Sequence, residues 1–255
     1  MGKKINCLLC QSSKLEVTEI IKSGDIIKLW EKQHNNVRQL FNGVDSLEKY
    51  LCANCKLEFF YPFVPGDDEF YSKLGQEDWY YLHEDKTEFS YSVKYIQDGD
   101  SVLDIGSGRG AFTKYIDKNI TYTGLDLSSK AIKYAQEENI NVLEQTIESY
   151  ANTNKEIHDV VVAFQVLEHI VSPVNFLSRF KNNLKDTSYI YIEVPDVVAA
   201  HKGKNRQEFG LEHFHVFSMS SLDIMINKAG FKTIEINRIQ DPSGKYTLFA
   251  FAKIK

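Results

Sequence analysis

Short apolar runs alternate with helical periodicity from residue 99 to the end of the chain. The runs predict seven strands, at 101–105, 121–125, 141–144, 159–164, 189–194, 231–239 and 246–254. The clearest helical patterns lie between them, at 128–139, 173–184 and 220–229. Strands that alternate with helices indicate a doubly wound, mostly parallel α/β sheet. The last two strands are separated by a turn around 242–244, which predicts that the final strand is antiparallel.

The N-terminal region has a different pattern, because it holds all four cysteines of the chain in two Cys-x-x-Cys pairs. These are Cys7/Cys10 and Cys52/Cys55. Two such pairs can direct four thiolates to one point, which is the closed tetrahedral shell of a structural zinc ion. Unrelated thiols or a redox pair are the alternatives, but no neighbouring βαβ pattern supports a redox role. We expect residues 1–65 to form a small module in which zinc supplies folding energy that so short a segment lacks.

Residues 66–98 connect this module to the main domain, which we place at 99–255. The connector is rich in aromatic residues: Phe70, Tyr71, Trp79, Tyr80, Tyr81, Phe89, Tyr91 and Tyr95. They fit a helical segment that packs on the main sheet and equally a lid over an active site. The hydrophobic periodicity of this segment does not distinguish the packed helix from the lid.

The amino-acid composition limits the classes of binding partner that we expect for this protein. The formal net charge is −5, from 35 acidic and 30 basic side chains, so no general field attracts nucleic acid or anionic lipid. No apolar run approaches the ~20 residues of a membrane span, and the N-terminus lacks the apolar region of a signal peptide. We expect a cytoplasmic protein that acts on a small molecule.

The most informative segment is a glycine loop after the first main-domain strand, which we expect to open a helix. Gly106, Ser107 and Gly108 follow an apolar run, and such a turn lets the backbone approach a ligand. Asp126, twenty residues after Gly106, can hold a ribose diol. By themselves these residues fit a nicotinamide or an adenosyl cofactor.

Two features favour a sulfonium cofactor over a dinucleotide. Asp104 places a carboxylate two residues before the first glycine, where it would repel a pyrophosphate but attract a methionyl ammonium group. The antiparallel final strand also departs from a wholly parallel dinucleotide fold.

In this order and spacing, segments 102–110, 124–128 and 159–170 resemble the motifs of class I S-adenosylmethionine-dependent methyltransferases. The resemblance implies that the glycine loop lines the cofactor and that Asp126 holds its ribose. It also implies that Leu127 packs on adenine and that Gln165 reaches the methionyl end. Many relatives contact the adenine amino group through an Asp, and here Thr146, or Gln145 beside it, stands in its place.

The segment Glu212-His213-Phe214-His215 follows the fifth strand, on the edge where open α/β sheets bind ligands. It resembles the Glu-His segment of sugar methyltransferases that carry an N-terminal zinc module, in which the histidine matching His213 is the proposed base. Those relatives often have Tyr where this chain has Gly210. A packed structural role is the alternative for both histidines, and more so for His215.

A third group, Glu168 and His169, follows the fourth strand. With Gln165 and His213 or His215, it resembles the divalent-metal site of some relatives, although Gln165 replaces their first Glu. Alternatively, residues 167–169 cap the following helix.

The sequence therefore predicts a methyltransferase for a hydroxyl of a sugar or surface-polysaccharide precursor. Carbon or nitrogen methylation, a nicotinamide oxidoreductase and a non-catalytic cofactor-binding protein are the alternatives.

Overall fold

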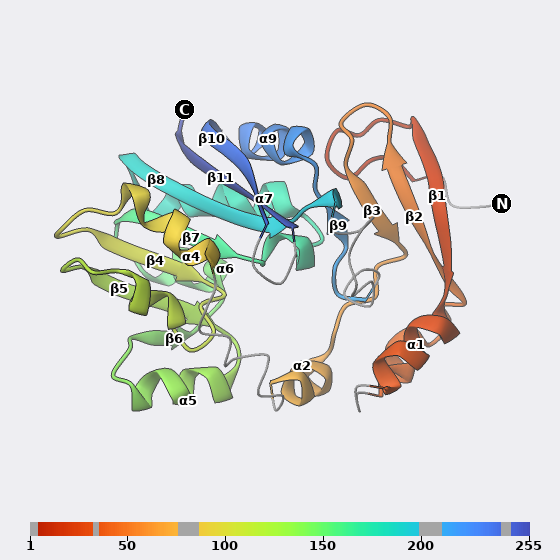
Figure 1. Cartoon of the computed structure of the whole chain (residues 1–255), viewed down its shortest axis with the longest axis horizontal. Coiled ribbons are helices and arrows are strands. Elements are labelled where there is room, and N and C mark those ends of the chain that lie inside the picture. The colour runs from red at the N-terminus through yellow and green to blue at the C-terminus, as the bar shows by residue number, and fades with distance from the viewer. Residues whose placement is uncertain (1–4, 33–35, 76–86, 199–210, 241–245) are drawn as a thin grey trace.

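The computed structural model describes residues 5–32, 36–75, 87–198, 211–240 and 246–255, which form two sheets side by side (Figure 1). The larger sheet has seven strands in the order β10-β11-β8-β7-β4-β5-β6. Their bounds are β4 Ser101–Ile105, β5 Thr121–Asp126, β6 Val142–Glu144, β7 His158–Phe164, β8 Leu184–Pro195, β10 Phe231–Gln240 and β11 Tyr246–Ile254. Strands β4 to β8 are parallel, whereas β11 is antiparallel to both neighbours. The predicted fold class is confirmed.

Helices cover both faces of this sheet, as a doubly wound fold requires (Figure 1). One face packs on α6 (Ile147–Thr153), α7 (Pro173–Arg179) and α9 (Met219–Lys228), through residues such as Tyr150, Leu177 and Met225. The other face packs on α4 (Thr87–Ser92), η2 (Val93–Tyr95) and η3 (Ala111–Tyr115), while α5 (Ser129–Glu137) covers Val142. Both faces are buried, which explains why the central strands read as continuous apolar runs.

Two predicted helices differ in the structure. The glycine loop opens the short 3-10 helix η3 rather than an α-helix. The helix predicted at 173–184 ends at Arg179 and continues as the 3-10 turn η5 (Phe180–Asn183). The buried amide of Asn183 donates to the carbonyls of Asn154 and Glu156 at 3.2 and 3.0 Å. These bonds hold the chain where it must turn into β8.

The second sheet draws on both halves of the chain. Its order is β1 (Leu15–Lys22), β2 (Ser46–Cys52), β3 (Glu58–Tyr61) and β9 (His215–Val216), all antiparallel. Helix α1 (Ser23–Glu31) and the 3-10 turn η1 (Arg38–Phe41) connect β1 to β2, and α2 (Asp68–Leu74) follows β3. The fourth strand therefore comes from the segment that carries the candidate catalytic histidines.

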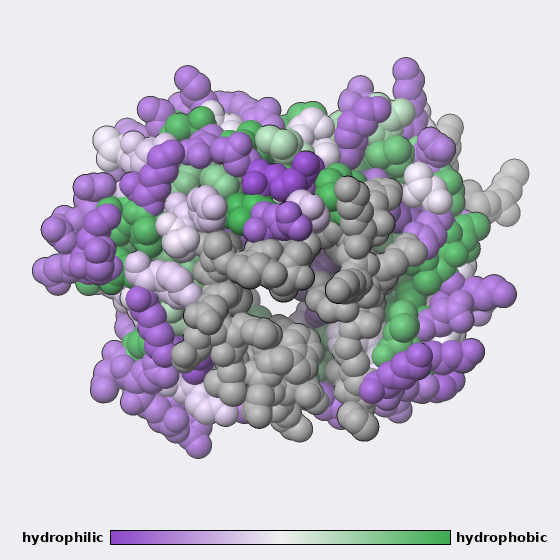
Figure 2. Space-filling model, viewed as in Figure 1, coloured by the Kyte–Doolittle hydropathy of each residue, from purple (hydrophilic) through white to green (hydrophobic). Residues whose placement is uncertain are grey.

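The two sheets share one hydrophobic core. Cys7, Cys52 and Phe59 belong to the same buried cluster as Phe217 and Leu222. On the outer edge strand β1, in contrast, Ile20 is 63% exposed. Hydrophilic residues make up most of the outline of the face shown in Figure 2. None of the helices in the described part of the chain is both long and apolar enough to cross a membrane.

Residues 87–95 of the aromatic connector pack on the main sheet, whereas Phe70 in the earlier described part packs on Trp30 of the N-terminal region. The rings of Phe89 and Phe164 lie 4.7 Å apart edge to face, and Tyr91 stacks on Phe249 at 5.6 Å. Trp79, Tyr80 and Tyr81, as well as Gly210 and the turn at 242–244, lie outside the described residues. The packing interpretation therefore holds for 87–95, and the lid stays a prediction.

Candidate functional site

The four cysteines meet at one point. All four Sγ atoms lie within 4.8 Å of one another, with Cys7–Cys55 and Cys10–Cys52 separations of 3.5 Å. Each pair sits on the same kind of turn, closed by the N–H of Gln11 or Lys56 donating to the carbonyl of Cys7 or Cys52 at 2.9 Å. Thiolates around tetrahedral zinc are about 3.8 Å apart, because the Zn–S bond is about 2.3 Å. The donor set fits zinc with little rearrangement.

The glycine loop lies at the carboxyl end of β4. Gly106, Gly108 and Gly110 have φ values of 70°, 56° and 74°, a region that side-chain-bearing residues rarely occupy. A Cβ at Gly106 would lie 2.7 Å from Cγ2 of Val166, just past β7. The loop therefore needs glycine both for its conformation and for its contact with the segment that follows β7.

Asp126 ends β5 and faces this loop. Its Oδ2 accepts a hydrogen bond from the N–H of Gly108 at 2.8 Å, and its Oδ1 accepts one from the N–H of Ser128 at 2.8 Å. Burial raises the pKa of this carboxyl, and the N–H groups act in the opposite direction. A carboxylate can accept about four hydrogen bonds, so it retains capacity for a ribose diol. Leu127 beside it is 65% exposed and offers an apolar surface.

The other predicted cofactor residues differ from one another in burial and in hydrogen bonding. Asp104 is buried within β4, where its Oδ2 accepts a hydrogen bond from the Tyr122 hydroxyl at 2.7 Å. Burial raises the pKa of Tyr122 well above its ordinary value, with Asp104 as a second cause, so the phenol remains a donor. Thr146 is exposed, and its hydroxyl caps α6 by accepting from the N–H of Ser149 at 3.1 Å. Ser107 is half-buried in the loop.

A cluster of acid and base groups lies beside the loop. Glu168 and His169, in the 3-10 turn η4 (Leu167–His169), and His213 each place one ligand-type atom within 4.8 Å of the other two. The rings of His169 and His213 are 4.5 Å apart in an edge-to-face arrangement. The N–H of His169 donates to the carbonyl of Val166, the residue that contacts Gly106. The structure thus brings two separate predicted groups together.

Main-chain hydrogen bonds hold His213 in this position. The N–H of Phe214 donates to the carbonyl of Glu168 at 2.7 Å, and the carbonyl of Phe214 accepts from the N–H of Phe60 in β3 at 3.0 Å. Between Leu211 and His213 the chain makes a γ-turn, in which Glu212 has a φ of 60°. Strained backbone of this kind is typical of functional sites.

Tyr71 of α2 adds a residue that the sequence did not single out as catalytic. The residue is 39% exposed, and its hydroxyl makes a hydrogen bond to Glu212. Burial raises the pKa of Tyr71, and the negative charges of Glu212 and Glu168 add to the shift. Tyr71 is therefore a hydrogen-bond donor at neutral pH. No sequence pattern distinguishes it from the other aromatic residues of the connector.

His215 lies apart from the cluster. It is fully buried in β9, and its Nε2 lies 2.9 Å from the carbonyl of Ile170, to which it donates. This environment favours the packed, structural interpretation over a catalytic role. The alternative helix-capping role for residues 167–169 is wrong, because α7 begins at Pro173 with Ser172 as its N-cap.

Gln165 follows β7 with a φ of 55°, and its Nε2 donates to Glu193 in β8 at 2.7 Å. Glu193 is not among the residues that the sequence predicted. It lies near the carboxyl end of the fifth strand of the main sheet, so the argument from the ligand-binding edge, which was applied to residues 212–215, could have found it.

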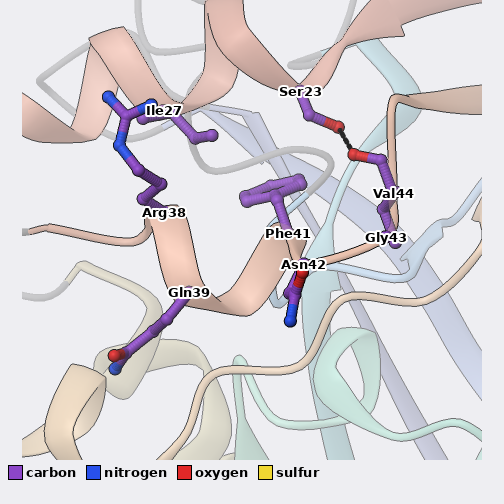
Figure 3. A pocket seen from close by; sticks show the side chains of 8 residues that line it. All are labelled: Ser23, Ile27, Arg38, Gln39, Phe41, Asn42, Gly43 and Val44. Atoms are coloured by element: carbon purple, nitrogen blue, oxygen red, sulfur yellow. Dashed lines mark hydrogen bonds between the residues drawn. The ribbon is translucent and has the colours of Figure 1, made fainter.

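A separate pocket of about 420 Å³ lies in the N-terminal region (Figure 3). It is lined by Ser23, Ile27, Arg38, Gln39, Phe41, Asn42, Gly43 and Val44. Its polar groups bond within the protein: the Ser23 hydroxyl donates to the carbonyl of Val44 at 2.6 Å, and Arg38 pairs with Glu31 at 2.9 Å. None of its residues belongs to the glycine loop or to the acid and base cluster.

Comparison with known proteins assigns this architecture to a family. The family described as "Methyltransferase domain" matches residues 77–236, which include the glycine loop, Asp126 and His213. The chain belongs to this methyltransferase family. The predicted enzyme class, a methyltransferase, is thereby confirmed at the level of the family.

Individual relatives are distant. A ubiquinone biosynthesis O-methyltransferase of Serratia proteamaculans is 28% identical over 98 residues, which are 36% of this chain and 41% of the relative. A SAM-dependent methyltransferase from Archaeoglobus fulgidus superimposes with a TM-score of 0.57 at 20% identity, over 73% of this chain and 100% of the other. A Burkholderia thailandensis 1,6-didemethyltoxoflavin-N1-methyltransferase with bound S-adenosylhomocysteine gives 0.56 at 16% identity, over 72% and 85%. The chain spans about half or less of the curated relatives it matches, between 38% and 50% of the first three.

We predict that His215 makes the stability of this methyltransferase pH-dependent. Burial lowers the pKa of His215 to about 4, although its backbone contacts oppose the shift. The unfolded chain, with a histidine pKa of about 6.5, takes up a proton that the native state excludes. Native stability should therefore fall as the pH drops from about 6.5 towards 4, by up to about 3 kcal/mol.

The measurement is urea unfolding at several pH values, with His215→Gln as the matched control. Glutamine can keep the hydrogen bond to Ile170 but does not titrate. The variant should lose less stability than the wild type over the same interval. Equal losses would show that His215 does not cause the dependence.

Proposed function

We propose that this protein transfers the methyl group of S-adenosylmethionine to a hydroxyl oxygen of a small molecule. The observation that carries the proposal is the position of His213, beside His169 and Glu168 and next to the segment that contacts the glycine loop. Methyl transfer from a sulfonium is an in-line displacement, and a hydroxyl acceptor must lose its proton. A histidine at the cofactor edge suits that task at neutral pH.

The residues around the glycine loop fit the cofactor. Gly106, Ser107 and Gly108 would line it, Asp126 would accept the ribose hydroxyls, and exposed Leu127 would pack on adenine. Asp104 and Gln165 would approach the methionyl end, and Thr146 the adenine amino group. S-adenosylmethionine, when bound, supplies the electrophilic methyl group.

His213 would act as the general base, and Glu212 and Tyr71 would lie beside it. The hydrogen bond between Tyr71 and Glu212 stabilises the strained turn that precedes His213. Tyr71 also places a phenol from the connector at this site, which supports a role for α2 as part of a cover over the acceptor.

For the acceptor we propose a sugar or a nucleotide sugar, including a precursor of a surface polysaccharide. Support comes from the resemblance of the paired cysteine module and the Glu-His segment to those of sugar methyltransferases. Curated relatives such as that of Serratia proteamaculans are named O-methyltransferases, which favours oxygen over carbon or nitrogen.

A second candidate is a metal-dependent methyltransferase, favoured by the convergence of Glu168, His169 and His213. A carboxylate and two imidazoles suit a divalent transition metal. A metal bound there would lower the pKa of the acceptor hydroxyl, so that His213 would be a ligand rather than a base.

The cofactor assignment predicts that Asp126→Ala weakens binding of S-adenosylhomocysteine at least about tenfold, because the ribose loses a charged acceptor. Isothermal titration calorimetry measures the affinity, and methyl incorporation into nucleotide sugars measures turnover. Asp117→Ala, which removes an exposed carboxylate just before β5, is the matched control and should bind normally. Wild-type protein that binds NADH but not S-adenosylhomocysteine would contradict the proposal.

The base and metal hypotheses predict different results for His213→Gln and His169→Gln. If His213 is the base, its substitution lowers kcat by about 10²–10⁴, with a much smaller loss for His169→Gln. Added Mn²⁺ or Zn²⁺ then has no effect. If the cluster binds metal, both variants lose comparable activity and excess metal restores part of it. If both variants turn over substrate at the wild-type rate, both hypotheses are contradicted.

For the four cysteines we propose a structural zinc ion. One zinc per chain is expected in purified protein, and Cys52→Ser should lose it and unfold at a markedly lower temperature, because metal binding is coupled to folding. Elemental analysis and thermal unfolding test this. Ser13→Ala, a surface change between the cysteine pairs, should keep both properties. Metal-free wild-type protein of unchanged stability would refute the zinc site.

A further inference from the structure

Glu193 holds Gln165 at two points. Phe164 pairs with Glu193 across the parallel strands β7 and β8, and Gln165 directly follows Phe164. The N–H of Gln165 donates to the carbonyl of Glu193 at 3.0 Å, and its side-chain Nε2 donates to Oε1 of Glu193 at 2.7 Å. Backbone and side chain of Gln165 are therefore both tied to one residue of β8.

The carboxylate itself is rigidly placed. Glu193 is fully buried, and its second oxygen, Oε2, accepts a hydrogen bond from the Tyr191 hydroxyl at 3.1 Å. Tyr191 is also fully buried, and its ring stacks on Phe249 at 5.8 Å. A side chain with packed neighbours and a donor on each oxygen has little freedom to turn.

This arrangement determines which end of the Gln165 amide faces away from Glu193. A carboxylate only accepts hydrogen bonds, so the NH₂ group must point to Glu193 and the carbonyl oxygen must point away. That oxygen, Oε1, is buried and accepts no hydrogen bond from the residues that the structure describes. A buried carbonyl in this state attracts a cationic or strongly polar donor.

The residue that carries this oxygen follows β7, beside the glycine loop. Gln165 directly precedes Val166, whose methyl group occupies the space that a Cβ on Gly106 would need. Strands β4 and β7 are neighbours up to the pair Ile105 and Ala163, so the two turns leave the sheet side by side.

We propose that Glu193 is a positioning residue for the cofactor site: it orients the Gln165 amide so that its carbonyl oxygen receives the cationic amino-acid end of S-adenosylmethionine. This inference rests on the proposed function. Glu193 does not touch the cofactor, and it acts only through Gln165. It therefore contributes to recognition of the amino-acid end and not to recognition of adenosine.

The test is calorimetric binding of two ligands to Glu193→Gln. A glutamine at 193 can bond to Gln165 in either amide orientation, so the carbonyl is no longer held outward. Affinity for S-adenosylhomocysteine should fall about tenfold. Affinity for 5′-methylthioadenosine, which lacks the amino-acid end, should change less than about twofold, whereas general damage would weaken both ligands.

A double-mutant cycle with Gln165→Ala completes the test. If Glu193 acts through Gln165, Glu193→Gln causes no further loss of affinity in the Gln165→Ala background. Additive losses, or equal losses for both ligands, would overturn the inference. If Glu193→Gln does not fold, Glu193→Asp serves in the same cycle, because its shorter side chain cannot reach Gln165. Wild-type protein that binds neither ligand would instead refute the proposed function.

Discussion

The backbone of Phe214 joins the two sheets of this protein. Its N–H donates to the carbonyl of Glu168 after β7, and its carbonyl accepts from Phe60 in β3. One residue therefore connects the carboxyl edge of the main sheet, where we propose that the cofactor binds, to the second sheet, which carries the cysteine turns. His213 lies directly before it, so the same two bonds place the candidate base. The site is consequently built from both sheets and depends on their relative position.

The cysteine cluster has a broader role in this arrangement than the stabilisation of a short module. Cys7 and Cys52 share a buried cluster with Phe217 and Leu222, which lie just beyond the candidate catalytic segment. A closed four-thiolate site does no chemistry itself. By holding the ends of β2 and β3, it would support the strand to which β9 is bonded. The proposed zinc and the proposed base are thus linked through packing.

Among the described residues, four of the five non-glycine residues with positive φ lie at these same places, and the fifth, Asn139, follows α5. Gln11 and Lys56 follow the two cysteine pairs, Gln165 follows β7, and Glu212 precedes His213. Such conformations are costly for residues other than glycine and persist where surrounding bonds require them. At Gln165 and Glu212 the chain leaves regular structure abruptly, which turns side chains towards the edge of the sheet. The unfavourable backbone conformations of Gln165 and Glu212 therefore occur at positions where the direction of a side chain matters for the candidate site.

The sequence by itself determined the main sheet with its seven strands, the glycine loop with Asp126, and the grouping of the four cysteines at one common site. These features are local, because strand runs, turn glycines and Cys-x-x-Cys spacing each express their chemistry within a few residues. The convergence of Glu168, His169 and His213, the approach of Tyr71 and the burial of His215 were decided only by the tertiary structure. They depend on β9 pairing with β3 and on the bonds of Phe214, contacts between residues more than forty or a hundred and fifty positions apart that no local pattern encodes. The position of Glu193 near the carboxyl end of a strand could be predicted from the sequence. Its hydrogen bond to Gln165 could not.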